Sequence, residues 1–272
     1  MREANKFPKW TFNATLIVAG IIVLFLFLYP ILLLIFLGAN EIISALEIGS
    51  FLGSIEVTFI ISTAAAVFAV IVGTPFAYLL ARHEFRFKEV VDAIVDLPIM
   101  IPHVIVGIMI VLAFASTSGL SPFFHAIGFN VIDTLLGAII TVIFLSATYP
   151  IRIFEGAIRQ VDPDVELTAR TLGATPQFTF VHVVIPKIWR SVANGAIIAW
   201  ARAVAEVGAL LVVAYYILLN GSLISPSSIY IYEAYEGLGL AGALKFSAAL
   251  VIVIFAVFIA YRAILKYARK KR

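Results

Sequence analysis

Six long runs of apolar residues dominate the chain, and each is long enough to cross a lipid bilayer as a helix. A bilayer core of about 30 Å requires roughly 20 residues of helix. The runs lack the alternation of polar and apolar residues that marks the strands of a membrane barrel. We therefore expect an all-α polytopic membrane protein with a single transmembrane domain over residues 1–272. Its six transmembrane helices are predicted at residues 15–37, 57–80, 97–115, 135–151, 192–219 and 243–264.

The composition excludes a water-soluble enzyme. Hydrophobic residues make up 62% of the chain and charged residues only 13%, whereas an average soluble domain is about 25% charged. The absence of Cys excludes a disulfide framework, a thiolate metal site and a Cys nucleophile. The four His residues lie far apart in the sequence without a close-spaced pair, so we expect structural or interfacial roles for them and no metal site.

Basic residues are unevenly distributed between the loops. All of the 19 Lys and Arg residues except Arg202 and Lys245 fall at the two termini or in the loops after the second and fourth runs. The positive-inside rule therefore predicts a multi-pass protein of the cell membrane with both termini in the cytoplasm. The net charge of +3 then reflects topology beside membrane lipid, and no nucleic-acid partner is indicated. The apolar part of the first run exceeds the ~7–15 residues of a signal-peptide core, so we expect it to be a retained helix.

Residues 152–190 form the largest polar insertion. Asp162-Pro163 and Thr175-Pro176 each combine an N-cap residue with Pro at the first helical position, and Gly173 suits a helix end. The pattern predicts two short helices that are too small to form a core of their own. The residues alone leave two alternatives open: a helix pair that docks onto a partner, or a lid on the bilayer surface.

The stretch DPDVELTARTLGA at 162–174, followed by VVIP at 183–186, resembles the cytoplasmic signature of ABC importer permeases. Gly173 and Pro186 have the spacing of that signature. Leu167 and Thr168 replace its Glu and first Ala, and a glutamate stands one position early. The resemblance implies that residues 152–190 are a coupling-helix loop that binds a separate ATPase. The residues that it places near this contact are Glu166, Leu167, Thr168, Ala169, Arg170, Gly173 and Pro186.

Two further stretches, 96–107 (DLPIMIPHVIVG) and 199–209 (AWARAVAEVGA), are similar to the third and fifth spans of permeases for sulfate, molybdate and tungstate. Together with YY at 215–216 and IYIYE at 229–233, the pattern most resembles archaeal-type tungstate/molybdate permeases. The resemblance implies the type I ABC importer permease fold. It also implies a second copy of the chain, two ATP-binding subunits and an extracytoplasmic oxyanion-binding protein as partners.

The chain lacks the G-x-x-x-x-G-K-[ST] loop that cradles phosphates, so ATP would have to bind to another polypeptide. We expect no catalytic residue here. The sequence GLGLAG at 237–242 fits a dinucleotide fingerprint, but it precedes a membrane helix instead of following a strand. We therefore expect no cofactor.

Arg202 and Glu206 are ionisable residues four positions apart within the fifth run. Such residues are costly inside a membrane and indicate function by default. Two alternatives stay open: a structural ion pair, or a face that lines an anion pathway. In the pathway, Arg202 would attract the oxyanion and Glu206 would weaken its hold, because a tightly bound cargo would stall.

These observations predict a permease subunit of an ATP-driven importer for tungstate or molybdate, not an enzyme. One alternative is sulfate as the cargo of the same type of importer. Another is a secondary transporter that works without ATP, which would be expected to show internal inverted repeats. We find no clear repeat between residues 1–136 and 137–272.

Overall fold

The computed structural model describes residues 9–114, 121–219 and 221–270. The ends of the chain, on whose basic residues the predicted orientation partly depends, lie outside these ranges. The chain divides into two units. One comprises Met1–Ile48 and Ala234–Arg272, and the other comprises Gly49–Glu233.

The first unit is built from long apolar helices. Its elements are α1 (Lys9–Gly38), η1 (Ala39–Glu41), α2 (Ile42–Leu46) and the greater part of α14 (Ser227–Lys270). The segment Phe12–Leu46 has a mean hydropathy of 3.0 and buries none of its most apolar part within the chain. A helix that is apolar on all sides and exposed is suited to a lipid environment.

Small residues allow these helices to approach one another. A Cβ atom at Gly38 would lie 2.6 Å from Ala248 Cβ, so α1 meets α14 at a point where only glycine fits. The helix α14 is interrupted at Gly239, where φ is 68° and ψ is −165°, a conformation that other residues rarely adopt. The helices predicted at 15–37 and 243–264 are confirmed, since they lie within α1 and α14.

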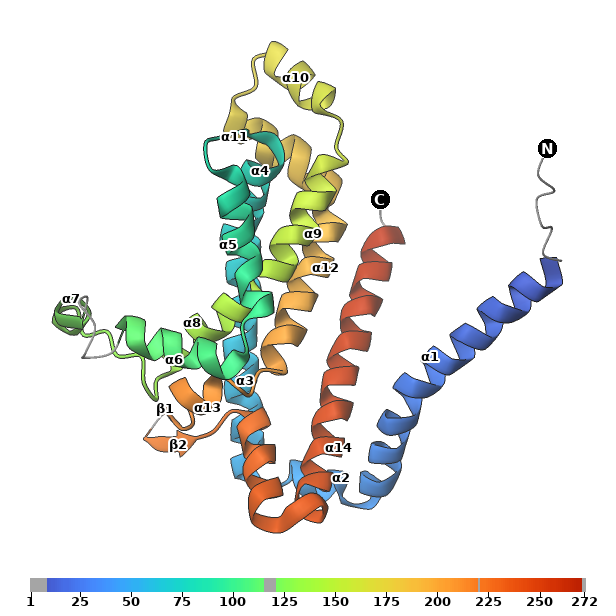
Figure 1. The fold of residues 1–272 in the computed structure, drawn as a ribbon, viewed down its shortest axis with the longest axis vertical. Coiled ribbons are helices and arrows are strands. Elements are labelled where there is room, and N and C mark those ends of the chain that lie inside the picture. The colour runs from blue at the N-terminus through green and yellow to red at the C-terminus, as the bar shows by residue number, and fades with distance from the viewer. Residues whose placement is uncertain (1–8, 115–120, 220, 271–272) are drawn as a thin grey trace, which may run out of the picture. The chain divides into compact units, whose positions relative to one another are not determined.

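The second unit is a helical bundle. Figure 1 shows α12 alongside α3 and α9, with α4 packed against α9. The helices α3 and α4 form one continuous helix, because η2 joins them through a π-helical turn. The elements of this unit are α3 (Gly49–Phe68), η2 (Ala69–Gly73), α4 (Thr74–Arg82), α5 (Lys88–Met100), α6 (His103–Phe114), α7 (Ser121–Ala126), α8 (Leu135–Ser146), α9 (Thr148–Arg159), α10 (Pro163–Thr171), α11 (Pro176–Thr179), η3 (Phe180–Val184), α12 (Ile185–Val204), α13 (Leu210–Val213), β1 (Ile217–Leu219), β2 (Ser222–Ile224) and the start of α14.

Two apolar clusters form the core of this bundle. One gathers buried side chains from α3, α6, α8 and α13, and the other gathers those from α4, α9, η3 and the start of α12. In the second cluster the fully buried Phe154 lies directly against Gly195, where a larger residue would collide with its ring. This second cluster is the platform that carries α10 and α11.

The first short helix predicted within 152–190 is confirmed as α10, and the second begins where predicted but is not short, because α11 continues through η3 into α12. Asp162 caps α10 by accepting a hydrogen bond from Asp164 N at 3.0 Å, and Thr175 Oγ1 accepts one from Phe178 N at 3.2 Å at the start of α11. Gly173 follows α10 with φ at 92°, which glycine adopts without strain. Capping signals read from the sequence therefore located both helices.

The third predicted span is not one straight helix. The helices α5 and α6 meet at an angle of 117°. The break falls at Ile101 and Pro102, because Pro has no amide hydrogen and forces the preceding residue into an extended conformation. Ile101 has that conformation, with φ at −84° and ψ at 129°. The last residue of the predicted run, Ala115, lies outside the described residues.

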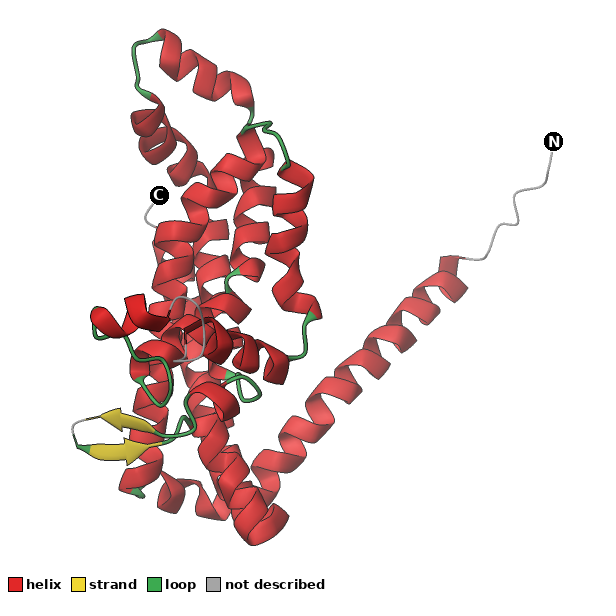
Figure 2. Cartoon of the chain, turned by 60° about the vertical axis from the view of Figure 1, so that its left-hand side comes forward, coloured by secondary structure: helices red, strands yellow, loops and turns green. Residues whose placement is uncertain are grey.

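The fifth predicted span, 192–219, is also wrong in extent. Its helix α12 ends at Val204, and an irregular segment at 205–209 leads to the single turn α13 and the strand β1. Figure 2 shows the hairpin of β1 and β2, in which Leu218 faces Leu223 across the antiparallel pair. Apolar composition alone did not distinguish helix from hairpin, because β1 is as apolar as the helix before it.

By length and composition, three helices within the described residues can cross a membrane, or up to five if each bent pair counts as one span. The bent pairs are α5 with α6, and α8 with α9, which meet at 45°. The chain is therefore a multi-pass membrane protein, and six crossings stay a prediction.

Candidate functional site

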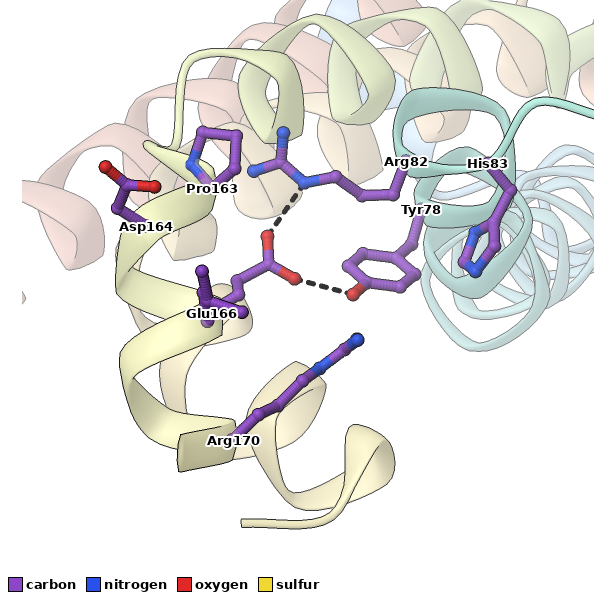
Figure 3. A pocket seen from close by; sticks show the side chains of 8 residues that line it. Tyr78, Arg82, His83, Pro163, Asp164, Glu166 and Arg170 are labelled. Carbon is purple, nitrogen blue, oxygen red and sulfur yellow. Dashed lines mark hydrogen bonds and ion pairs between the residues drawn. The ribbon is translucent and has the colours of Figure 1, made fainter. Parts of the chain in front are cut away.

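Glu166 joins α10 to the end of α4. Its side chain is buried, with 6% of the residue exposed. Arg82 Nε donates to Glu166 Oε1 at 2.7 Å, and Tyr78 Oη donates to Oε2 at 2.6 Å (Figure 3). Arg82 Nη2 also donates to the carbonyl oxygen of Val161 at 2.5 Å. This clamp ties α10 and the turn before it to the long helix Gly49–Arg82.

A cavity of about 280 Å³ lies beside the clamp (Figure 3). The ring of Tyr78 packs edge-on against the ring of Phe180 in η3, with 4.9 Å between the ring centroids. This contact supports the tyrosine that donates to the Glu166 carboxylate. A buried charge that is paired and fully hydrogen-bonded serves as a rigid connection. The residues lining the cavity are Tyr78, Arg82, His83, Pro163, Asp164, Glu166, Leu167 and Arg170.

The α10–α11 segment also presents apolar side chains to solvent. We call Leu167, Leu172 and Phe178 the docking face; they are 61%, 84% and 52% exposed. Leu167 lines the cavity beside the clamp, whereas Leu172 and Phe178 line a separate groove of about 490 Å³ together with Ala169, Gly173, Ala174 and Thr175. Exposed apolar side chains on a polar segment make this face a candidate contact surface.

The residues predicted for the ATPase contact therefore divide between two surfaces. Glu166 points inward to α4, and Ala169 is half-buried. The others are exposed: Leu167, Thr168, Arg170, Gly173 and Pro186.

The structure brings His103 between Arg202 and Glu206. Arg202 Nη2 lies 2.6 Å from His103 Nε2, whereas Arg202 Nη1 lies 3.8 Å from Glu206 Oε2. His103 Nδ1 is 2.8 Å from the same Oε2. Glu206 is 1% exposed, and its Oε1 accepts a hydrogen bond from Ala209 N at 3.0 Å. The two predicted pathway residues thus form a long ion pair, and His103 contacts both of them.

Sequence reasoning missed His103 as a site residue. It assigned structural or interfacial roles to all four His residues because they form no close-spaced pair in the sequence. His103 begins α6, at the break after Pro102, and 99 positions separate it from Arg202. The only available signal was that His103 and Arg202 each fall in one of the two stretches that resemble oxyanion permeases.

Arg152 is a second cluster centre that the sequence reasoning used only for topology. Its guanidinium contacts Asp92 at 2.7 Å, Asp96 at 2.8 Å and Glu155 at 2.7 Å. Glu155 also pairs with Arg159 at 2.7 Å. The network connects α5 to α9, two helices that are remote in the sequence.

Tyr216 and Glu233 connect two of the stretches singled out in the sequence. Tyr216 Oη donates to Glu233 Oε1 at 2.5 Å, and Ser225 Oγ donates to Oε2 at 3.3 Å. The hydrogen bond to the Glu233 carboxylate raises the pKa of Tyr216 to about 12. The pair lines a cavity of about 420 Å³ next to the hairpin.

Within the described ranges, no three His, Asp or Glu side chains converge as metal ligands would. Within each charged cluster described above, the acidic and basic side chains pair with one another instead.

Comparison with known proteins gives matches along most of the chain. A family model described as "Binding-protein-dependent transport system inner membrane component" matches residues 73–270. The molybdate/tungstate transport system permease protein WtpB of Pyrococcus furiosus is 34% identical over 209 residues, which cover 77% of this chain and 76% of that protein. The sulfate transport system permease protein CysT of Synechocystis is 27% identical, covering 86% of this chain and 83% of that protein.

Solved structures agree on the fold. A chain of a bacterial ABC transporter involved in the import of the acidic polysaccharide alginate superposes with a TM-score of 0.72 at 21% identity. The match covers 95% of this chain and 96% of that chain. At this identity the likeness concerns the fold alone, which is that of type I ABC importer permeases.

Proposed function

This chain belongs to the family of binding-protein-dependent transport system inner membrane components, and from that premise we propose that it is the permease of an ATP-driven importer for molybdate or tungstate. It acts as a transport subunit, and a separate ATPase hydrolyses ATP. The observation that carries the proposal is the α10–α11 segment, which is anchored to α4 by Glu166 and exposes the apolar side chains of the docking face.

Each of two ATP-binding subunits would cover the docking face of one permease chain. Leu167, Thr168, Arg170 and Gly173 lie at the exposed surface available for this contact. Glu166 would act from beneath, because it fixes α10 to α4. ATP can shift the transporter between two states only if it binds one state more tightly. A rigidly attached helix pair is the element through which such a bias would reach the membrane helices.

The anion pathway would run past Arg202 and Glu206, with a second copy of the chain forming the facing wall. The side chain of Arg202, which is 26% exposed, supplies a positive charge. The buried carboxylate of Glu206 limits how strongly this charge attracts an anion. The two structural units would function as one transmembrane domain over residues 1–272. It would have six crossings, with both termini and residues 152–190 in the cytoplasm.

Molybdate and tungstate are the favoured cargoes because the relative in Pyrococcus furiosus carries them in its name. Sulfate is the second candidate, since a sulfate permease relative is also similar over most of the chain. All three are tetrahedral dianions, so one guanidinium in the pathway discriminates poorly between them. An extracytoplasmic binding protein would therefore select the cargo before it reaches this chain.

The test is uptake of labelled molybdate, tungstate and sulfate into vesicles that contain the chain, its ATP-binding subunit and its binding protein. We expect molybdate or tungstate to accumulate with ATP and a divalent cation, and not with ADP. Accumulation by the chain alone, without ATP, would contradict the proposal and indicate a secondary transporter. Selective accumulation of sulfate would reassign the cargo.

A further inference from the structure

We infer that His103 is a positioning residue of the anion pathway, which holds the Arg202 guanidinium away from the Glu206 carboxylate and so keeps its charge available to an oxyanion. This inference rests on the pathway role proposed for Arg202. It adds a residue and a task that neither the sequence motifs nor the family assigned.

Contacts on two sides define the place of His103. Arg202 Nη2 lies 2.6 Å from His103 Nε2 and 3.4 Å from Nδ1, so the guanidinium packs against the imidazole ring. Nδ1 lies 2.8 Å from Glu206 Oε2. His103 therefore stands between a cation and an anion and touches both.

The state of Glu206 Oε2 explains why a contact is needed that keeps the Arg202 guanidinium away from it. This oxygen is buried, and among the described residues no donor is aligned to form a hydrogen bond with it. An unsatisfied buried carboxylate oxygen is costly, so a donor that can reach it gains stability by doing so. Arg202 Nη1 is 3.8 Å away, about 1 Å beyond a charge-assisted hydrogen bond. In the arrangement observed, Arg202 contacts His103 more closely than it contacts this oxygen.

Closure would cancel the charge that the pathway needs. A guanidinium paired directly with a carboxylate presents little net positive charge to a dianion. The guanidinium held by His103 keeps its charge available, and 26% of the Arg202 side chain is exposed. His103 thus determines whether Arg202 acts as an anion-attracting group or as half of an ion pair.

The backbone around His103 keeps it in place. A Cβ atom at Gly208 would lie 3.0 Å from His103 Cβ, so the segment after α12 packs closely on the start of α6. Ser228 Oγ donates to the backbone carbonyl oxygen of Glu206 at 2.6 Å and so holds the backbone of this residue.

The test measures the KM and kcat of ATP-driven molybdate uptake in vesicles that hold the assembled transporter. For His103→Ala we expect KM to rise about tenfold, with kcat changed less, because Arg202 closes onto Glu206. His103→Gln should restore KM to within about threefold, because its amide oxygen can accept at the position of Nε2. His103→Asn is the matched control, since its amide is too short to reach Arg202 and should behave like His103→Ala.

The double variant His103→Ala/Glu206→Gln separates positioning from packing. Removing the carboxylate leaves Arg202 nothing to close onto, so KM should fall back toward the value of the unmodified transporter. A packing role would add the two defects instead, and that result overturns the inference, as would equal KM values for His103→Gln and His103→Asn. If His103→Ala fails to assemble with the ATP-binding subunit, the comparison of Gln with Asn decides.

Arg202→Ala distinguishes a failure of the proposed pathway role from a failure of the inference about His103. Unchanged uptake by a correctly assembled Arg202→Ala transporter would remove the proposed pathway role. Impaired uptake in Arg202→Ala, with normal uptake in His103→Ala, would overturn the inference about His103 alone.

Discussion

The guanidinium of Arg82 and the carboxylate of Glu166 are 84 positions apart in the sequence and 2.7 Å apart in the structure. Arg82 ends α4, and Glu166 lies on α10. A buried ion pair therefore joins α10 to the helix Gly49–Arg82 in addition to the connecting chain.

Glu166→Ala should weaken this connection without removing the docking face. We expect the free energy of unfolding to fall by about 3 kcal/mol, because Arg82 loses its buried partner. Uptake should fall while the ATP-binding subunit still co-purifies. Thermal unfolding of the purified complex gives the first quantity, and Asp164→Ala, an exposed acid in the first turn of the same helix, is the control. Equal stability of the two variants would rule out the clamp.

Leu172→Asp should abolish co-purification of the ATP-binding subunit while membrane insertion is preserved. Leu172 is 84% exposed, so the substitution does not disturb the core, but it places a charge in the centre of an apolar interface. Leu218→Asp on the hairpin is the matched control, because Leu218 is 64% exposed and lies on a different part of the chain. Retained co-purification with Leu172→Asp would move the contact elsewhere.

Gly173→Asp should abolish uptake by distorting the turn between α10 and α11. Its φ of 92° lies in the left-handed region, which costs other residues about 1–2 kcal/mol. Thr171→Asp adds the same charge two positions earlier, where the backbone is helical, and should be tolerated better. Uptake assays with quantified membrane insertion compare the two. Full uptake and normal ATPase binding by Gly173→Asp would contradict the coupling role of this turn.

Arg202→Ala should lower oxyanion uptake at least about tenfold while the ATPase still assembles, because the pathway loses its positive charge. Arg190→Ala is the control. Arg190 lies on the same helix α12 as Arg202 but is exposed and lies near the opposite end of that helix. Labelled molybdate uptake, normalised to the assembled complex, is the measurement. A normal rate for Arg202→Ala would exclude this residue from the pathway.

Gly107→Ala should destabilise the site by forcing α6 away from the segment that carries Glu206. The added Cβ would lie 2.8 Å from the carbonyl oxygen of Ala209, and such overpacking costs about 1–3 kcal/mol. Gly156→Ala is the matched control on α9, because nothing lies within 4 Å of its Cβ position. Thermal unfolding should show a lower midpoint for Gly107→Ala only. A midpoint no lower than that of Gly156→Ala would indicate that α6 can shift freely.

The sequence by itself determined the features that depend on neighbours along the chain. Apolar runs predicted the membrane helices α1 and α14. Cap residues at Asp162 and Thr175 located α10 and α11. These features could be predicted because hydropathy, capping and Pro geometry act over a few residues. The spacing from Gly173 to Pro186 also pointed to the family.

Only the tertiary structure decided which distant residues meet. Glu166 belongs to a clamp with Arg82, and His103 lies between Arg202 and Glu206, because helices remote in sequence pack side by side. The positions at which helices end inside apolar runs could also not be predicted from the sequence. At Val204 the chain leaves α12 without a change in hydropathy, since the helix and the hairpin use the same apolar residues. Local propensity fixes short elements, whereas long-range packing sets the pairing of charges.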